Sequence, residues 1–290
     1  MSRSRLQARL APYYLVLPGW LWLVLFFVVP TFVMLSVSTQ TGDIVSGFKQ
    51  TFHWHTYIEA WDRYHVQLVR SLFYGLVATL LCLLIGYPVA YWIAFRGGPY
   101  KSSLLFLLLL PFFVSFVIRT LSWNFMLSDN GIVLSPLRHL GLIGSRFHVL
   151  QTPYAVIGGL TYNFIPFMVL PIYVALERVD RALLEASADL YASSREAFRK
   201  VVFPLSLPGV FAGVLLTFVP ASADYVNASI LGGTKTTMIG NIIQTEYFTN
   251  LNYPMAAALS FILMAVLLIG IFAYARALGT EEAMEMAATA

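Results

Sequence analysis

Two ionisable residues stand inside long apolar runs of the sequence, where an unpaired charge is costly. Arg119 lies in the run Leu104 to Leu127, and Asp224 lies in the run Leu207 to Leu231. In a membrane, such residues face other protein groups or a water-filled path. Three roles are therefore open for Asp224: it lines a path for a charged solute, pairs with Arg119, or caps a helix that breaks at Pro220.

The residues around Asp224 have the chemistry to bind a cationic amine. Ser222, Tyr225 and Asn227 add a hydroxyl group, an aromatic ring and an amide to the carboxylate. Together these groups offer charge, hydrogen bonds and cation–π contact. Arg119 would repel a cation, so a structural ion pair is its expected role, although its depth keeps it among the path candidates. Two weaker candidates for the path lie on another apolar run: Tyr162 and Asn163.

The sequence shows no pattern typical of catalysis, metal binding or nucleotide binding. His53 and His55 are one residue apart, but no third ligand accompanies them. Cys82 is the only cysteine, so it can form neither an intrachain disulfide nor a cysteine-based metal site. The stretch Gly232 to Thr236 (GGTKT) lacks the glycine that precedes the lysine of a phosphate-binding loop. We expect no catalytic residue, no metal and no cofactor on this chain.

Composition indicates that the elements holding these residues lie in a membrane. Of the 290 residues, 59% are hydrophobic and only 11% are charged, whereas a soluble domain carries about 25% charged residues. Six apolar runs reach the length of about 20 residues that a spanning helix needs. We therefore predict an all-α polytopic membrane protein with about six transmembrane helices, at approximately Tyr13 to Val37, Ser71 to Phe95, Leu104 to Leu127, Pro153 to Leu176, Leu207 to Leu231 and Pro254 to Ala275.

The Lys and Arg residues between the runs predict the orientation. Placing the N-terminus inside leaves most of these residues in cytoplasmic loops, as the positive-inside rule requires. The first run follows Arg3, Arg5 and Arg9 but is too long for a signal peptide, so we expect a retained helix. The predicted organisation is a cytoplasmic N-terminus at 1–12, one transmembrane domain at 13–277 and a cytoplasmic tail at 278–290. The outer loops carry aromatic residues, which either form a docking surface or rest at the headgroup level.

A cytoplasmic loop at 177–206 gathers charge in a chain otherwise poor in it. Asp180 is a predicted N-cap for a short helix through Leu190. Ser193 and Glu196 have the spacing of a capping box, which would start a second helix that ends before Pro204. The two short helices would meet near residues 191–192. A helix-turn-helix between two membrane spans has the shape to dock into a groove on another protein.

The loop resembles the signature loop of binding-protein-dependent ABC importer permeases. In that family the pattern begins Glu-Ala-Ala, has a glycine a few residues later and ends in Leu-Pro. Tyr191 stands at the glycine position, where a left-handed residue other than glycine costs about 1–2 kcal/mol, so the turn here either differs or is strained. The matching residues are Glu185, Ala186, Ala188, Asp189, Leu190, Ala192, Ala197, Phe198, Pro204, Leu205, Leu207 and Pro208.

The resemblance extends over nearly the whole chain and includes the permease subunits of spermidine/putrescine importers. It implies an ABC type I importer permease fold in the bacterial inner membrane, with both termini in the cytoplasm. It also implies a second permease subunit, two copies of an ATPase that binds ATP and Mg, an extracytoplasmic binding protein and no nucleic acid. The stretches that carry it are Leu84 to Ala90, Leu110 to Trp123, Ser128 to Val133, Pro166 to Tyr173 and Leu231 to Gln244.

By this resemblance the loop couples the chain to the ATPase, and the transported solute is a polyamine. Glu185 would anchor the loop through a hydrogen bond to the ATPase or to the second helix of the loop. Ser193 and Glu196 would shape the second helix. Other small solutes, such as iron, thiamine or a phosphonate, stay open as alternatives. An ion-coupled secondary transporter is a further alternative, but the sequence shows no inverted repeat of the kind that class carries.

Overall fold

The computed structural model describes residues 16–144 and 147–288, with side chains described as far as Arg276. The predicted N-terminal segment 1–12 lies outside these residues. Within them, five helices are long and apolar enough to cross a membrane, or six if one bent pair counts as a span. The all-α prediction with about six spans is therefore confirmed. The five helices are Val16–Ser38, His55–Arg96, Pro153–Glu177, Ser194–Ala223 and Tyr253–Arg276.

The third predicted span is not one straight helix. Helical residues Gly98–Phe113, which include α4 (Lys101–Leu109), and α5 (Phe116–Leu127) meet at an angle of 88°. Pro111 lies in a 3₁₀ turn at the end of the first part, and Val114 and Ser115 have extended ψ angles of 139° and 135°. A proline has no N–H for the helical ladder, so the run breaks there although its hydrophobicity is continuous.

The fifth predicted span, Leu207 to Leu231, is also wrong at both ends. Its helix begins at Ser194 in the charged loop and ends with α10 (Phe203–Ala223). Asp224 is extended, with ψ 134°, and the short helix α11 (Val226–Leu231) follows. Hydropathy averages over such a break because the residues on both sides of it are apolar.

The chain divides into two compact units, which we describe separately. The first comprises residues 16–63 with 243–265. It contains the helix Val16–Ser38, whose last part is α2 (Val29–Ser38), and an antiparallel hairpin of β1 (Gln40–Asp43) and β2 (Gly47–Gln50). The Asp43 carboxylate closes the hairpin turn by accepting the N–H groups of Val45 and Ser46 at 2.8 and 2.6 Å.

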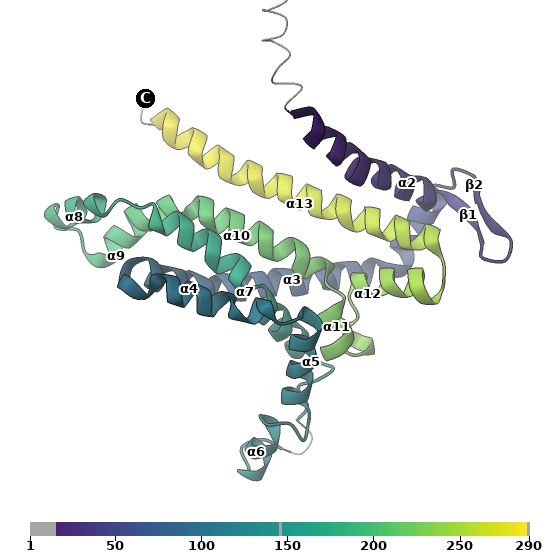
Figure 1. The fold of residues 1–290 in the computed structure, drawn as a ribbon, viewed down its shortest axis with the longest axis horizontal. Helices are drawn as coiled ribbons and strands as arrows, with labels where there is room; N and C mark the ends of the chain where they lie inside the picture. The colour runs from purple at the N-terminus through teal and green to yellow at the C-terminus, as the bar shows by residue number, and fades with distance from the viewer. Residues whose placement is uncertain (1–15, 145–146, 289–290) are drawn as a thin grey trace, which may run out of the picture. The chain divides into compact units, whose positions relative to one another are not determined.

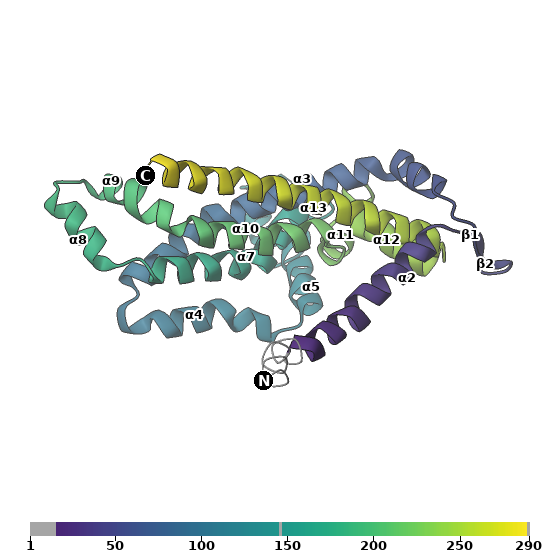
Figure 2. The ribbon, with the colours of Figure 1, turned by 90° about the horizontal axis from the view of Figure 1, so that it is seen from above.

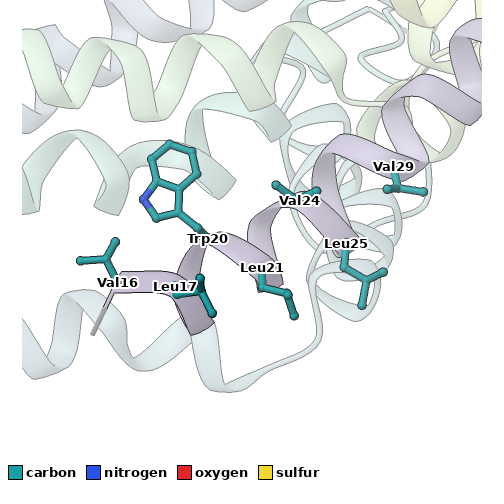
Figure 3. A pocket seen from close by; sticks show the side chains of 7 residues that line it. All are labelled: Val16, Leu17, Trp20, Leu21, Val24, Leu25 and Val29. Atoms are coloured by element: carbon teal, nitrogen blue, oxygen red, sulfur yellow. The ribbon is translucent and has the colours of Figure 1, made fainter. Parts of the chain in front are cut away.

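An apolar hollow of about 610 Å³ belongs to the first unit (Figure 3). Its lining comes only from the helix Val16–Ser38, and every lining side chain is apolar: Val16, Leu17, Trp20, Leu21, Val24, Leu25 and Val29. Among the described residues, no charged side chain lines this hollow. The hollow suits lipid chains or an apolar protein surface, so it is no candidate for the solute path.

The second unit comprises residues 64–242 with 266–288 and holds the main core. In it α7 (Pro153–Glu177) and α10 run side by side, with α3 (His55–Arg96) packed against α7 (Figures 1 and 2). A β-carbon on Gly209 would lie 2.6 Å from the Pro171 carbonyl oxygen, and one on Gly213 would lie 2.8 Å from the Met168 sulfur. These glycines let the two backbones approach closely, as small residues do between membrane helices.

Cys82 lies within this core, as a small buried residue of α3. Its side chain is fully buried, and the thiol donates to the Thr161 carbonyl oxygen of α7 at 3.3 Å. The core around it is formed by large apolar side chains such as Leu160, Met168 and Ile172. The cysteine therefore serves packing.

Candidate functional site

The charged loop forms the predicted helix-turn-helix at one end of the second unit (Figure 1). Its first helix is α8 (Arg181–Asp189), and Asp180 caps it by accepting the Ala182 N–H at 2.9 Å. Its second helix starts with α9 (Ser194–Ala197). There the Ser193 N–H donates to the Glu196 carboxylate at 2.9 Å and the Glu196 N–H donates to the Ser193 hydroxyl at 3.4 Å. Both predicted caps are therefore present.

The turn between the helices keeps the geometry for which glycine is suited. Tyr191 has φ +59°, its N–H donates to the Ala188 carbonyl at 2.9 Å, and the Ala192 N–H donates to the Ser187 carbonyl at 3.0 Å. These two bonds define a Schellman motif with Tyr191 at the left-handed position. The turn is thus strained rather than different. Its tip is open, since Leu190 and Tyr191 are 81% and 97% exposed.

The second helix of the loop does not end before Pro204, as the sequence had suggested. It continues through a π turn at Phe198–Val202 into α10, so that residues 194–223 form one helix. The Phe203 N–H bonds to the Phe198 carbonyl, five residues back. This wider turn shifts the hydrogen-bond ladder directly before Pro204, where a proline would otherwise clash with a carbonyl and leave it unpaired.

Aromatic rings hold the base of the loop. Phe198 lies edge-on to Tyr87 and Tyr91 of α3, with ring centroids 5.8 Å apart in both pairs. The Tyr87 hydroxyl is 2.8 Å from that of Ser206 in α10. Lys101, the first residue of α4, forms an ion pair with Glu177 at the end of α7, at 2.9 Å. The loop is therefore fastened to the spanning helices while its tip stays free.

Glu185 makes no hydrogen bond within the described residues, so the expected bond to the second helix of the loop is absent there. Its side chain is exposed on α8. Glu196 supplies the carboxylate that caps the second helix instead. Of the remaining loop residues in the family pattern, Ala186, Ala188 and Asp189 are exposed, while Ala192, Ala197 and Phe198 are half-buried.

The candidate path residues gather where α10 breaks. Asp224 is 8% exposed, and one of its carboxylate oxygens accepts the Asn227 N–H at 2.8 Å. The role of capping a broken helix, one of the three considered for Asp224, is thus present. Neighbouring backbone packs closely against this break at two glycines. A β-carbon on Gly75 would meet the Ser222 hydroxyl, and one on Gly240 would lie 2.6 Å from the Ala223 carbonyl oxygen.

A buried polar cluster joins three helices beside this break. The Asn163 amide of α7 donates to the Asn227 side-chain oxygen of α11 at 3.0 Å and to the Thr120 hydroxyl of α5 at 3.2 Å. The Thr120 hydroxyl, which has one proton to donate, lies 3.1 Å from the Phe116 carbonyl oxygen and 3.4 Å from the Asn227 side-chain oxygen. Thr120, Asn163 and Asn227 are at most 1% exposed. The sequence predicted Asn163 and Asn227 as path candidates, but Thr120 was not among them.

Arg119 does not form the predicted ion pair with Asp224. Its guanidinium carbon lies 4.7 Å from the ring centroid of Phe112 and 5.7 Å from that of Phe116. The residue is 8% exposed, and its Nε and Nη1 atoms have no hydrogen-bond partner among the described residues. The 88° bend before α5 explains the error, because sequence position alone cannot give the direction in which Arg119 points.

Two aromatic path candidates are more accessible. Tyr225 is 45% exposed, and its carbonyl accepts the side-chain amide of Asn241 at 2.9 Å. Tyr162 is half-buried and lies edge-on to Trp123 at 5.3 Å. The fully buried Ser222 has a hydroxyl without a partner among the described residues. Of the path candidates, Tyr225 and Tyr162 thus have the more accessible side chains.

An ionic cluster orders the loop that follows α5. Asp129 accepts bonds from Arg138 and His148, both at 2.8 Å. The bond from His148 and then that from Arg138 hold the pKa of Asp129 below its usual range. Arg138 lies in α6 (Leu134–His139), which these contacts tie to both ends of the loop. Among the described residues, no group of three His, Cys, Asp or Glu side chains could hold a metal ion.

Comparison with known proteins agrees with this architecture. The chain is 37% identical over 257 residues to the spermidine/putrescine transport system permease protein PotB of Haemophilus influenzae, covering 88% of this chain and 90% of that protein. Identity to PotB of Escherichia coli K12 is also 37%, covering 88% and 94%. In fold, the chain is similar to a solved bacterial ABC transporter that imports alginate, with TM-score 0.71, 18% identity and coverage of 94% and 97%.

A family description covers almost all of the described chain. Residues 18–277 match the binding-protein-dependent transport system inner membrane component. This range includes every span, the helix-turn-helix loop and the break at Asp224. The chain therefore belongs to the binding-protein-dependent transport system inner membrane components, the permease subunits of ABC importers.

Proposed function

We propose that this chain is a permease subunit of a polyamine importer and forms half of the path for spermidine or putrescine. The observation that carries the substrate class is the 37% identity to PotB proteins over 88% of the chain. The buried carboxylate of Asp224 beside the exposed ring of Tyr225 supports it, because a primary ammonium group binds to both kinds of side chain.

The other half of the path comes from a second, similar permease, and an extracytoplasmic binding protein delivers the solute. Both termini lie in the cytoplasm, which places the loop 177–206 on the cytoplasmic side together with most Lys and Arg residues. The chain itself supplies no ATPase site. ATP and Mg bind to two copies of a separate ATPase.

The loop connects ATP hydrolysis to the path. The exposed, largely apolar tip at Leu190 and Tyr191 enters a groove on the ATPase, and Glu185 forms a hydrogen bond there. When the ATPase dimer closes, the loop moves. The packing of Phe198 against α3 and the continuous helix at residues 194–223 pass that movement to the spans, which changes access to the path.

Reconstitution tests this proposal. The chain is placed in proteoliposomes with its second permease and the ATPase, and the binding protein is added outside with labelled spermidine or putrescine. ATP-dependent accumulation of either amine is expected, and omission of the binding protein should abolish it. Accumulation of a different solute with no polyamine uptake would exclude polyamines as the substrate class while leaving the permease role intact.

A further inference from the structure

The cluster of Thr120, Asn163 and Asn227 is too deeply buried to touch a solute. These side chains are 0%, 1% and 0% exposed, in contrast to Tyr225 at 45%. Asn163 sits at the centre, since its amide nitrogen donates to both other residues, at 3.2 and 3.0 Å. The cluster therefore acts on the path only through the elements that it joins.

One of those elements carries the cap at Asp224. Asn227 uses its side-chain oxygen to accept from Asn163 at 3.0 Å, and its backbone N–H to donate to Asp224 at 2.8 Å. A single residue thus links the cluster to the carboxylate. Any shift of α11 relative to α7 would move the N–H group that fixes one oxygen of Asp224.

The packing around the cluster leaves α11 little freedom while the bonds are intact. A β-carbon on Gly159 of α7 would lie 2.4 Å from the Leu231 side chain and 2.7 Å from the Asn227 side-chain oxygen. The Leu231 and Asn227 side chains of α11 therefore pack directly on the α7 backbone at Gly159. At such a distance the amide bonds fix the register of α11 on α7.

The three buried side chains of the cluster are polar, although apolar side chains at these positions could stabilise the helix contact equally well. The Asn163 side-chain oxygen is buried and has no hydrogen-bond partner among the described residues. Unpaired buried polar groups destabilise a fold, and where they persist they require an explanation other than stability. Here the explanation is the fixed position of Asn227.

We propose that Asn163, with Thr120, is a positioning residue for Asp224: it fixes α11, whose Asn227 N–H bonds to the Asp224 carboxylate, and so sets where that carboxylate lies. The inference rests on the proposed function, because it assumes that Asp224 meets the cationic solute. Asn163 thereby leaves the set of residues that contact the solute. Its effect on transport passes entirely through Asp224.

Uptake by the reconstituted importer tests this with matched variants. Asn163→Ala removes the central amide, and Thr120→Val removes the hydroxyl while keeping the shape of the side chain. Thr120→Ser retains the hydroxyl. Asn124→Ala is the control, because Asn124 also joins α5 to α11, by donating to the Ile230 carbonyl at 2.7 Å, but at the far end of α11 from Asp224.

Spermidine uptake at equal amounts of assembled complex is the first measurement. Asn163→Ala and Thr120→Val should each lower it by about tenfold or more, as expected when a buried bond is lost. Thr120→Ser and Asn124→Ala should stay within about twofold of the unchanged protein. Adding Asn163→Ala to Asp224→Asn should lower uptake no further than Asp224→Asn alone. Additive losses, or normal uptake by Asn163→Ala, would overturn the inference.

Labelling gives a measurement that does not need transport. Tyr225→Cys in a Cys82→Ala background places one reactive thiol on this chain, next to Asp224. Asn163→Ala should change the rate of its reaction with a charged, water-soluble thiol reagent by about tenfold, and Asn124→Ala by less than about twofold. Equal rates in all variants would refute the positioning role. A complex that fails to transport polyamines but shows this rate change would refute only the polyamine substrate.

Discussion

Phe198 of the loop lies edge-on to Tyr87 of α3, with ring centroids 5.8 Å apart, and Tyr87 is in turn bonded to Ser206 of α10 at 2.8 Å. Tyr87 thus links the helix-turn-helix, through Phe198, to α3 and α10. The loop tip, by contrast, is open, with Tyr191 97% exposed. A loop that is fixed at its base and free at its tip can transmit force from a bound partner.

Phe198→Ala should uncouple ATP hydrolysis from transport. The change removes ring contacts to Tyr87, Tyr91 and Phe203, each worth about 0.5–1.5 kcal/mol. We expect the complex to assemble and hydrolyse ATP, with less polyamine transported per ATP. The ratio of uptake to phosphate release in proteoliposomes measures this. Phe198→Tyr retains the ring and serves as the control, and an unchanged ratio in Phe198→Ala would rule out transmission through this contact.

Tyr191→Gly should relieve the strain in the loop turn. Tyr191 has φ +59°, and a left-handed residue other than glycine costs about 1–2 kcal/mol. The Ala192 amide, which closes the turn, should therefore exchange its hydrogen more slowly in the isolated permease pair. Tyr191→Ala keeps a β-carbon and should show no such slowing. If both variants bind the ATPase equally weakly, the tyrosine ring itself belongs to the docking surface.

The prediction of about six spans succeeds because hydrophobicity is a sum over many residues. The breaks depend on one or two residues each, and hydropathy does not detect them. Pro111 and Ser115 interrupt one run and Asp224 interrupts another, yet the flanking residues on both sides are apolar. A proline within an apolar run is a weak signal, since Pro166 and Pro171 lie inside the continuous helix α7.

The local chemistry of the loop could be predicted because caps act within a few residues. Asp180, Ser193 and Glu196 bond to groups at most three positions away, so spacing alone specifies them. The Thr120–Asn163–Asn227 cluster joins residues that are far apart in the chain. Only the fold brings them together, and for the same reason the expected pairing of Arg119 with Asp224 was wrong.

Glu185→Ala should weaken docking of the ATPase. The side chain is exposed and has no hydrogen-bond partner among the described residues, so its carboxylate is free to bind a partner subunit. A hydrogen bond to a charged group is worth about 1.5–3 kcal/mol, which corresponds to a loss of roughly tenfold or more in affinity. Pull-down of the ATPase and substrate-stimulated ATP hydrolysis both measure this loss of docking affinity. Glu185→Gln separates the charge from the hydrogen bond, and normal coupling in Glu185→Ala would exclude the anchoring role.

The loop around Asp129 should keep its structure down to acidic pH. The bonds from His148 and Arg138 hold the pKa of Asp129 below its usual 3.8. A lowered pKa in the folded state gives stability that is present above the ordinary value and is lost as pH falls through the lowered one. Hydrogen exchange in residues 128–144, corrected for intrinsic rates, should therefore rise only below about pH 4. Asp129→Asn should raise exchange at neutral pH and remove that dependence, and the same acid-induced rise in exchange in Asp129→Asn would contradict the assignment.

The contact between α7 and α10 predicts opposite effects for two glycine substitutions. In Gly209→Ala the new methyl group would lie 2.6 Å from the Pro171 carbonyl oxygen and 2.5 Å from the Ala175 side chain, so the helices must separate. In Gly158→Ala, on α7 itself, nothing lies within 4 Å of the new group, and alanine should favour the helix by about 0.5–1 kcal/mol. Thermal unfolding in detergent should therefore shift downward for Gly209→Ala and stay level or rise for Gly158→Ala. Equal shifts would show that helix propensity, rather than close approach of the two backbones, decides stability here.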